Sequence, residues 1–259
     1  MILFLLDQEQ EPNWSVKPAK TCLIFVHGYG GRALETWGDL KDLLLESPSI
    51  DQCDIVFLGY ESRSKQASAS SALIYNAVNR IVDHTNDILE LSGTDIRSDD
   101  FEYENVVLVG HSLGGVLVRD VLINLHREGK SWANRSKIML FAPAHSGAIA
   151  LDLVSRAGLL SSLLRPIEIV LFATSPVLRD MEIESPYLTG LRERARDLGP
   201  LAAARFVVHA TGDSVVSSNQ FCADPMSVFY SNQDHISCCK PIKTAFLNPL
   251  EDILAYYHG

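Results

Sequence analysis

The amino-acid sequence predicts an α/β protein with a doubly wound, mostly parallel sheet. Several short apolar runs have the composition of strands buried on both faces, which is typical of parallel sheets covered by helices. Segments with helical spacing of apolar residues alternate with these runs, which favours right-handed crossover connections. The chain has 259 residues, 47% of them apolar and 21% charged, which suffices for a substantial core. We expect a single domain over residues 1–259.

The expected elements follow one another without an internal repeat. Residues 1–20 are expected to form a short apolar strand and a polar connection with proline. Buried strands are expected at 21–26, 53–58, 106–109, 137–142 and 205–210, with a short last strand at 227–230. Helical spacing of apolar residues predicts helices at 34–44, 73–91, 116–125, 191–198 and 241–257, with 62–72 as a polar linker or a helix start.

The charge of the chain disfavours anionic partners, and its cysteine content disfavours disulfide bonds. With 22 basic and 32 acidic residues the formal charge is −10, which disfavours nucleic acid and anionic membrane surfaces as main partners. The five cysteines follow no pattern, and free thiols in a reducing compartment are expected. Cys238 and Cys239 lie close to His235, so a metal site is the weaker alternative there. No metal or cofactor is expected.

The first residues of the sequence bear on the cellular compartment of the protein. Residues 1–6 are apolar but too short for the central region of a signal peptide, and they lack a basic leader. No apolar stretch reaches the length of a transmembrane helix. We therefore expect a cytoplasmic protein for which transient membrane contact stays open.

The most informative stretch is the run Val-Val-Leu-Val-Gly-His-Ser-Leu-Gly-Gly at residues 106–115. An apolar, β-branched run ends at a Gly-x-Ser-x-Gly pentapeptide, and apolar positions with helical spacing follow at once. Strand, sharp turn and helix form the context in which such a serine projects its hydroxyl above the sheet. Gly110 and Gly114 are expected because a Cβ at either position would collide with a neighbouring strand or helix. The pattern predicts Ser112 as a nucleophile.

A serine hydroxyl needs a base, and the base needs an orienting acid. In this architecture they follow later strands in the order serine, acid, histidine. Asp213 follows a buried strand and His235 the next one, so they are predicted as acid and base. Asp224 and Asp234 remain rivals for the acid. The other histidines are weaker candidates. His126, His209 and His258 are disfavoured by their positions, and His111 is expected to point away from the site and to pack or form a hydrogen bond behind the turn.

A glycine-rich loop, residues 27–31, follows the strand at 21–26. Its sequence, His-Gly-Tyr-Gly-Gly, frees backbone N–H groups to point into a cleft. A negatively charged tetrahedral intermediate is held by the N–H after the nucleophile and by one N–H of such a loop. Tyr29 and Leu113 are predicted to supply these two N–H groups.

The stretch from Ser146 to Pro200 is too long for a single crossover, so a helical insertion over the carboxyl ends of the strands is expected. Its leucine-rich run predicts either an apolar cap for an acyl chain, with Leu160 and Leu164 lining the substrate, or helices that add to the core. His145, just after a strand, is a further tentative lining residue.

Together, the glycine-rich loop, the Gly-His-Ser-Leu-Gly-Gly run and the late Asp and His resemble the α/β-hydrolase superfamily. Ala142-Pro143-Ala144-His145-Ser146-Gly147 and Asp234-His235-Ile236-Ser237 through Lys240-Pro241 resemble the serine esterases and lipases akin to GPI inositol-deacylases. The resemblance extends from Thr21 onward, although relatives usually have Thr-Pro-His where this chain has Ala142-Pro143-Ala144-His145. It implies an α/β-hydrolase fold, with Ser112 as nucleophile, His235 as base and Asp213 as acid.

The sequence therefore predicts a serine carboxylester hydrolase of lipase or phospholipase type. Its substrate would be a small-molecule or lipid acyl ester, cleaved through an acyl-enzyme on Ser112. Two alternatives stay open. Acyl transfer or amide cleavage would use the same three residues, and an effector or signalling module of a larger system would share the fold.

Overall fold

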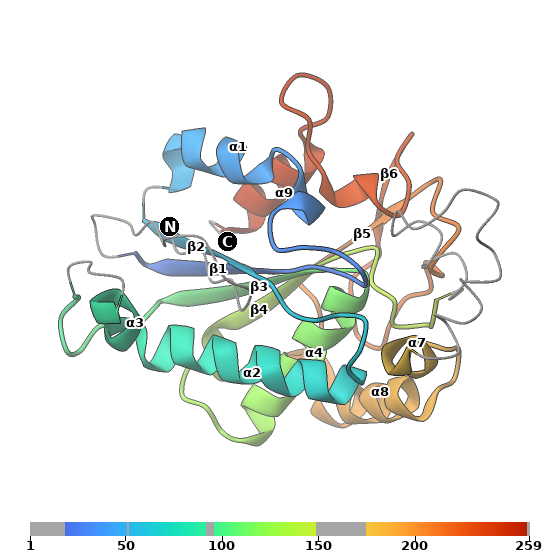
Figure 1. The fold of residues 1–259 in the computed structure, drawn as a ribbon, viewed down its shortest axis with the longest axis horizontal. Helices are drawn as coiled ribbons and strands as arrows, with labels where there is room; N and C mark the ends of the chain where they lie inside the picture. Colours follow the sequence, from blue (N-terminus) through green and yellow to red (C-terminus); the bar gives the residue numbers. More distant parts are fainter. Residues whose placement is uncertain (1–18, 51, 92–95, 149–174, 258–259) are drawn as a thin grey trace.

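The computed structural model describes residues 19–50, 52–91, 96–148 and 175–257. Its centre is a six-stranded sheet in the order β2-β1-β3-β4-β5-β6, and every neighbouring pair is parallel (Figure 1). The strands are β1 (Thr21–Val26), β2 (Cys53–Leu58), β3 (Asn105–His111), β4 (Ser136–Phe141), β5 (Phe206–Ala210) and β6 (Val228–Tyr230). The predicted doubly wound parallel sheet is confirmed, and each strand lies within about one residue of its expected range at either end, apart from β3, which extends to His111.

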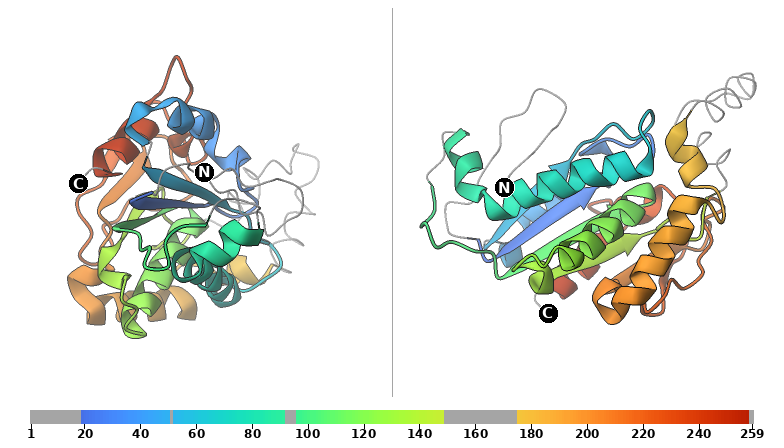
Figure 2. Two further views of the ribbon diagram at one scale, coloured as in Figure 1. Left: turned by 90° about the vertical axis from the view of Figure 1, so that its left-hand side faces the viewer. Right: turned by 90° about the horizontal axis from the view of Figure 1, so that it is seen from below.

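Helices cover both faces of the sheet. In Figures 1 and 2, α1 and α9 lie on one face, and α2, α3, α4, α7 and α8 lie on the other side. The α-helices are α1 (Leu40–Glu46), α2 (Ala67–Asp83), α3 (Thr85–Leu91), α4 (Leu113–Arg127), α7 (Pro176–Asp180), α8 (Pro186–Leu198) and α9 (Asn248–Tyr257). Short 3-10 helices are η1 (Glu35–Trp37), η2 (Pro48–Ile50), η3 (Ala133–Arg135), η5 (Gly199–Ala202) and η6 (Ser237–Cys239).

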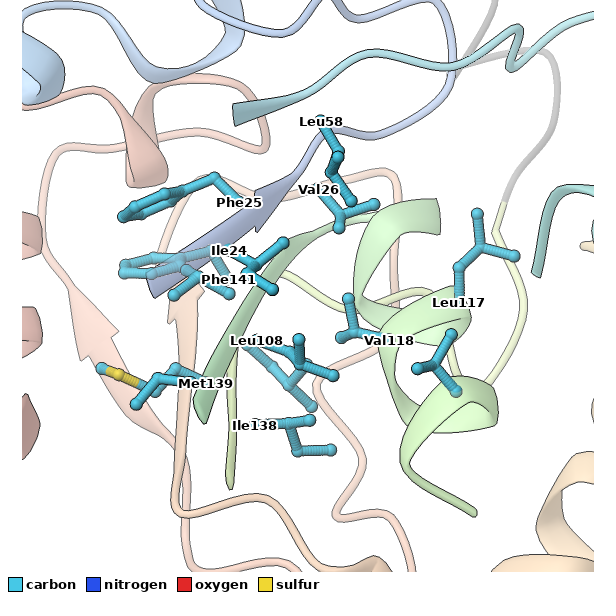
Figure 3. Close-up of a cluster of buried hydrophobic side chains, with 14 of the residues drawn as sticks. Ile24, Phe25, Val26, Leu58, Leu108, Leu117, Val118, Ile138, Met139 and Phe141 are labelled. Atoms are coloured by element: carbon cyan, nitrogen blue, oxygen red, sulfur yellow. The ribbon is translucent and has the colours of Figure 1, made fainter. Parts of the chain in front are cut away.

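The core lies on both faces of the central strands, as their continuous apolar composition requires. All six residues of β1 are buried, and β3 is buried after its first residue. On one face, side chains of β3 and β4 such as Leu108 and Ile138 meet Val118 of α4 (Figure 3). On the other face, the Phe25 ring stacks on Phe57 with the ring centroids 4.6 Å apart. The helix that carries the candidate nucleophile is therefore rigidly packed on the sheet.

Two predicted helices are divided in the structure. The expected helix at 34–44 consists of η1 and α1, separated at Gly38, whose φ of 56° lies in the left-handed region. The expected helix at 73–91 begins earlier, at Ala67, and its regular part ends at Asp83 before α3 begins at Thr85. The Thr85 hydroxyl donates to the carbonyl of Ile81 at 2.6 Å, a local bond that competes with continuation of the helix.

Two helices also begin elsewhere than the apolar spacing indicates. The charged helix expected from residue 191 begins at Pro186, after Ser185, whose hydroxyl oxygen accepts from the N–H of Leu188. The closing helix begins only at Asn248, because Ile242 and Phe246 pair as a turn and prevent the helix expected from residue 241.

The long insertion is described only from residue 175. There α7 and α8 follow the expected helical character, and α8 packs beside α4 instead of crossing the strand ends (Figure 2). Buried Leu188, Leu191 and Ala195 form its inner face. Leu160 and Leu164, and nearly all of the strand and connection expected at 1–20, lie outside the described residues.

All five cysteine thiols are unpaired, four of them buried and Cys222 exposed. Within the part of the chain that the structure describes, no helix combines the length and the apolar character needed to cross a bilayer.

Candidate active site

Ser112 occupies a strained turn between β3 and α4. Its φ of 54° and ψ of −119° are unusual for a residue with a side chain and are enforced by the surrounding packing. An ideal Cβ at Gly110 would lie 2.6 Å from Cα of Gly115, and one at Gly114 would lie 2.2 Å from the carbonyl oxygen of Val26. Both predicted collisions, with the helix and with the neighbouring strand, are confirmed. The turn requires glycine on both sides of the serine.

His235 lies between Ser112 and Asp213. Its Nε2 is 2.9 Å from Oγ of Ser112, and its Nδ1 is 2.9 Å from Oδ2 of Asp213. Asp213 follows β5 and His235 follows β6, so two loops at the same edge of the sheet supply the two partners of the serine. The side chains of His235 and Asp213 are each only 3% exposed. The structure thus brings together the three residues that the sequence predicts.

The surroundings of Asp213 keep it ionised. Burial raises the pKa of this carboxyl, but the hydrogen bond from His235 and the N–H groups of Val215 and Val216 outweigh burial and lower it. Burial also lowers the pKa of His235 below its usual 6.5, despite the opposing effect of Asp213. A neutral imidazole beside a carboxylate is the arrangement that accepts a proton from a serine hydroxyl.

The two rival carboxylates have other partners. Asp224 forms a bidentate ion pair with Arg119, with distances of 2.9 and 2.5 Å. Oδ1 of Asp234 accepts from the N–H groups of Ile236 and Ser237 at 3.0 and 2.8 Å and so shapes the turn after His235. Asp213, by contrast, lies at hydrogen-bond distance from the Nδ1 atom of His235.

The glycine-rich loop 27–31 approaches the serine closely. A Cβ at Gly28 would lie 2.9 Å from Cβ of Ser112. The N–H of Gly30 donates to Oγ of Ser62 at 2.9 Å, and that of Gly31 donates to the carbonyl of Gly28. The N–H groups of Tyr29 and Leu113 have no hydrogen-bond partner among the described residues. Both groups are thus available for an anion, as a two-donor site requires.

Residues that follow β2 hold this loop. Tyr60 donates from its hydroxyl to the carbonyl of His27 at 2.9 Å, and its N–H donates to Nε2 of His27. The two rings stack with their centroids 4.4 Å apart. Burial lowers the pKa of His27 to about 4, so its ring is neutral near pH 7. Sequence reasoning missed Tyr60 and Ser62, because nothing in their own segment indicates the loop that they contact.

His111 lies elsewhere than expected. It forms a hydrogen bond, but on the side of the candidate site and not behind the turn: its Nε2 donates to the backbone carbonyl of His235 at 2.8 Å. The ring centroids of His111 and His235 are 5.1 Å apart. His111 also lines a cavity beside Ser112. The last residue of β3 thus contacts the loop after β6, although β4 and β5 lie between these two strands in the sheet, and no local pattern reveals this relation.

His145 is placed in a buried polar cluster. Its Nε2 accepts from Nε of Arg119 at 2.9 Å, and its ring lies against Phe221 with the centroids 4.5 Å apart. It is 2% exposed and is not among the described residues that line the cavity beside Ser112. Arg119, wholly buried within α4, draws this histidine away from the cleft. Of the other histidines, His209 is buried within β5 and His126 lies in the last turn of α4.

The comparisons with known proteins concern the fold. No protein-family model matches the sequence, and no curated protein matches it. Among solved structures, the mature lipase BlEst2 of Bacillus licheniformis has a TM-score of 0.56 and 15% identity, covering 93% of this chain and 96% of that one. An esterase of Pyrobaculum calidifontis has a TM-score of 0.55 and 16% identity, covering 93% of this chain and 76% of that one.

A third solved structure covers less. Phospholipase PlaB of Legionella pneumophila has a TM-score of 0.51 and 21% identity, covering 75% of this chain, which spans only 40% of that one. At such identities the similarity concerns the course of the chain and not its chemistry. The parallel six-stranded sheet with helices on both faces, shared with these lipases and esterases, shows that this chain has the α/β-hydrolase fold.

Proposed function

We propose that this chain is a serine hydrolase that cleaves carboxylic esters through an acyl-enzyme. The observation that carries the proposal is the continuous hydrogen-bond chain from Ser112 through His235 to Asp213, with both distances at 2.9 Å. Such a chain activates a serine hydroxyl, which is a poor nucleophile without a base. The strained backbone of Ser112 and the two unpaired N–H groups nearby add the remaining parts of an acyl-transfer site.

The reaction follows from these positions. Oγ of Ser112 attacks the ester carbonyl while Nε2 of His235 takes the hydroxyl proton, and Asp213 stabilises the imidazolium. The N–H groups of Tyr29 and Leu113 stabilise the oxyanion. The intermediate collapses, the alcohol leaves with the proton from His235, and the acyl group stays on Oγ. Water, deprotonated by His235, then hydrolyses the acyl-enzyme and regenerates the serine.

We further propose that the acyl group of the substrate is of lipid type. We also propose that residues 1–259 form a single domain, in which 146–200 is an insertion. The support is the leucine-rich composition of residues 151–164, which includes Leu160 and Leu164. An apolar wall binds each methylene with about 0.8 kcal/mol, so kcat/KM is expected to rise about fourfold per methylene until the site is full. The resemblance to the branch akin to GPI inositol-deacylases agrees with an acyl ester of a lipid.

The first experiment is labelling by a fluorophosphonate probe, which reacts only with an activated serine. We expect labelling of the wild type and of Ser217→Ala, an exposed serine outside the site, and none of Ser112→Ala. Ser112→Ala should also lose hydrolysis of 4-nitrophenyl butyrate by several orders of magnitude with an unchanged melting temperature. Labelling or hydrolysis that persists in folded Ser112→Ala would contradict the proposal.

The second experiment tests the acyl group with 4-nitrophenyl esters from acetate to palmitate. We expect kcat/KM of the wild type to rise with chain length, and Leu160→Asp or Leu164→Asp to flatten the rise while retaining cleavage of the acetate. A flat profile in the wild type would remove the lipid from the proposal and leave the ester hydrolase intact.

A further inference from the structure

A cavity of about 330 Å³ lies beside the candidate nucleophile. Tyr29, whose N–H is proposed to hold the oxyanion, lines it, but the reaction steps above give no role to its other lining residues. The loop 27–31 forms one wall, and Gly28 in that wall comes so close that an added Cβ would lie 2.9 Å from Cβ of Ser112. His111 forms another wall, and Ile236 and Lys240, which follow His235 in the chain, complete the side near the base. A cavity of this size is at the small end of ligand sites. It is therefore placed to hold part of a molecule that reacts at Ser112.

The charges around this cavity are unequal. Arg32 and Glu35 both line it, and Nε of Arg32 lies 3.4 Å from Oε2 of Glu35, so this exposed pair largely compensates itself. Lys240 also lines the cavity and is half-buried. Its ammonium has no hydrogen-bond or ion-pair partner among the described residues. The cavity thus carries an uncompensated positive charge in a chain whose formal charge is −10.

A nearby lysine provides the contrast. Lys243 is exposed, and its Nζ lies 2.6 Å from Oε2 of Glu46, an acceptor that Lys240 lacks. A half-buried cation without a partner has lost part of its hydration and is stabilised by an anionic ligand. The position of Lys240 in the cavity and its unpaired charge are therefore those of a group that binds an anion from outside the protein.

We propose that Lys240 binds an anionic group of the ester, a carboxylate or a phosphate, and thereby selects anionic esters over neutral ones. The inference rests on the proposed ester hydrolysis at Ser112 and adds the class of substrate. The anion can belong to the acyl part or to the alcohol part of the ester, and the chemistry that recognises it is the same. A charge-assisted hydrogen bond of this kind corresponds to a preference on the order of tenfold to a hundredfold in kcat/KM.

The test compares two matched pairs of esters. For the acyl part, the pair is 4-nitrophenyl hydrogen glutarate and neutral 4-nitrophenyl valerate. For the alcohol part, it is 1-butyrylglycerol 3-phosphate and neutral 1-butyrylglycerol, with butyrate release as the readout. The measured quantity is the ratio of kcat/KM for the anionic and the neutral ester within each pair. We expect a ratio of at least ten in one pair, and that pair identifies the part of the substrate that carries the anion.

The variants assign the preference to Lys240. We expect Lys240→Gln to lower the ratio by about tenfold or more, mainly through KM for the anionic ester, Lys240→Glu to lower it further, and Lys240→Arg to retain it. Lys243→Gln, on the same loop but outside the cavity, is expected to leave both esters of each pair unchanged. A ratio that survives Lys240→Gln, or a wild-type ratio near one in both pairs, would overturn the inference.

A measurement on the wild type keeps the test independent of the fold of the variants. Raising the salt concentration from 0.01 to 1 M screens a partly exposed charge pair, so the ratio should fall while cleavage of the neutral ester changes little. A ratio independent of salt would contradict binding by Lys240. Failure of the proposed function looks different: no ester of either pair would be cleaved and no fluorophosphonate would react.

Discussion

Arg119 and Asp224 form an ion pair that is wholly enclosed in the protein and joins the helix of the candidate nucleophile to the loop before β6. Both nitrogens at the end of the guanidinium bind the carboxylate, at 2.9 and 2.5 Å, and the two side chains are 0% and 3% exposed. The same guanidinium donates to His145 and to the carbonyl of Ala202, while Asp224 also accepts from the N–H of Ala204. One buried charge therefore organises three segments that are distant in sequence.

Breaking this pair from one side is expected to destabilise the fold strongly. Arg119→Met leaves the Asp224 carboxylate buried without its cation, which costs about 3 to 5 kcal/mol of unfolding free energy. The measurement is urea unfolding at pH 7. The double variant Arg119→Met/Asp224→Leu removes both charges and should be more stable than Arg119→Met alone. If the two variants were equally unstable, packing and not the charge would determine the cost.

Substitution of the three candidate acids should separate their roles. Asp213→Asn is expected to lower kcat on the order of 10⁴-fold with little change in melting temperature, because an amide favours the wrong tautomer of His235. Asp224→Asn should lower the melting temperature, because it leaves Arg119 buried without a full countercharge. Asp234→Asn should stay near the wild type, since an amide oxygen still accepts from Ile236 and Ser237. Near-normal kcat in Asp213→Asn would assign the acid elsewhere.

The pH profile of kcat/KM should have an acidic limb with its midpoint below 6.5. His235 must be neutral to act as base, and burial lowers its pKa, so activity is retained to a lower pH than an exposed histidine would allow. Asp213 raises the pKa of His235 and His111 lowers it. The limb of His111→Gln should therefore move to higher pH, and the residual activity of Asp213→Asn should have its limb at lower pH. Profiles from pH 4 to 8 measure both shifts.

The strands could be predicted from the sequence because each is a continuous apolar run, and such runs have few alternatives to a buried parallel sheet. The ends of the helices could not, because contacts from distant segments determine them. The N-terminus of α2, for example, is capped by Oδ2 of Asp180, which accepts from the N–H of Ala67 at 2.7 Å across 113 residues of sequence. Apolar spacing contains no information about such a cap.

The residues of the candidate site likewise fall into those that the sequence predicts and those that only the structure places. Ser112, Asp213 and His235 stand directly after predicted strands, so the order of the strands suffices to place them at one edge of the sheet. His145 also follows a strand, but Arg119 holds it in the interior. That contact depends on which face of α4 is buried against the loop after β4, and a buried arginine within an apolar helix is its only trace in the sequence. The direction of the His111 side chain cannot be predicted in this way, because its hydrogen-bond partner is a backbone carbonyl, which no side-chain pattern marks.

Ser62 has a consequence for how this protein tolerates change. Its hydroxyl holds the N–H of Gly30, which leaves the neighbouring N–H of Tyr29 free at the edge of the site. The segment after β2 thus holds the loop 27–31 in position through hydrogen bonds, although the two are far apart in the sequence. Insertions or grafts between residues 59 and 66 are therefore expected to shift the N–H of Tyr29, although they replace none of the residues of the candidate site. A redesign of this segment is thus expected to lower the proposed esterase activity without any substitution in the candidate site.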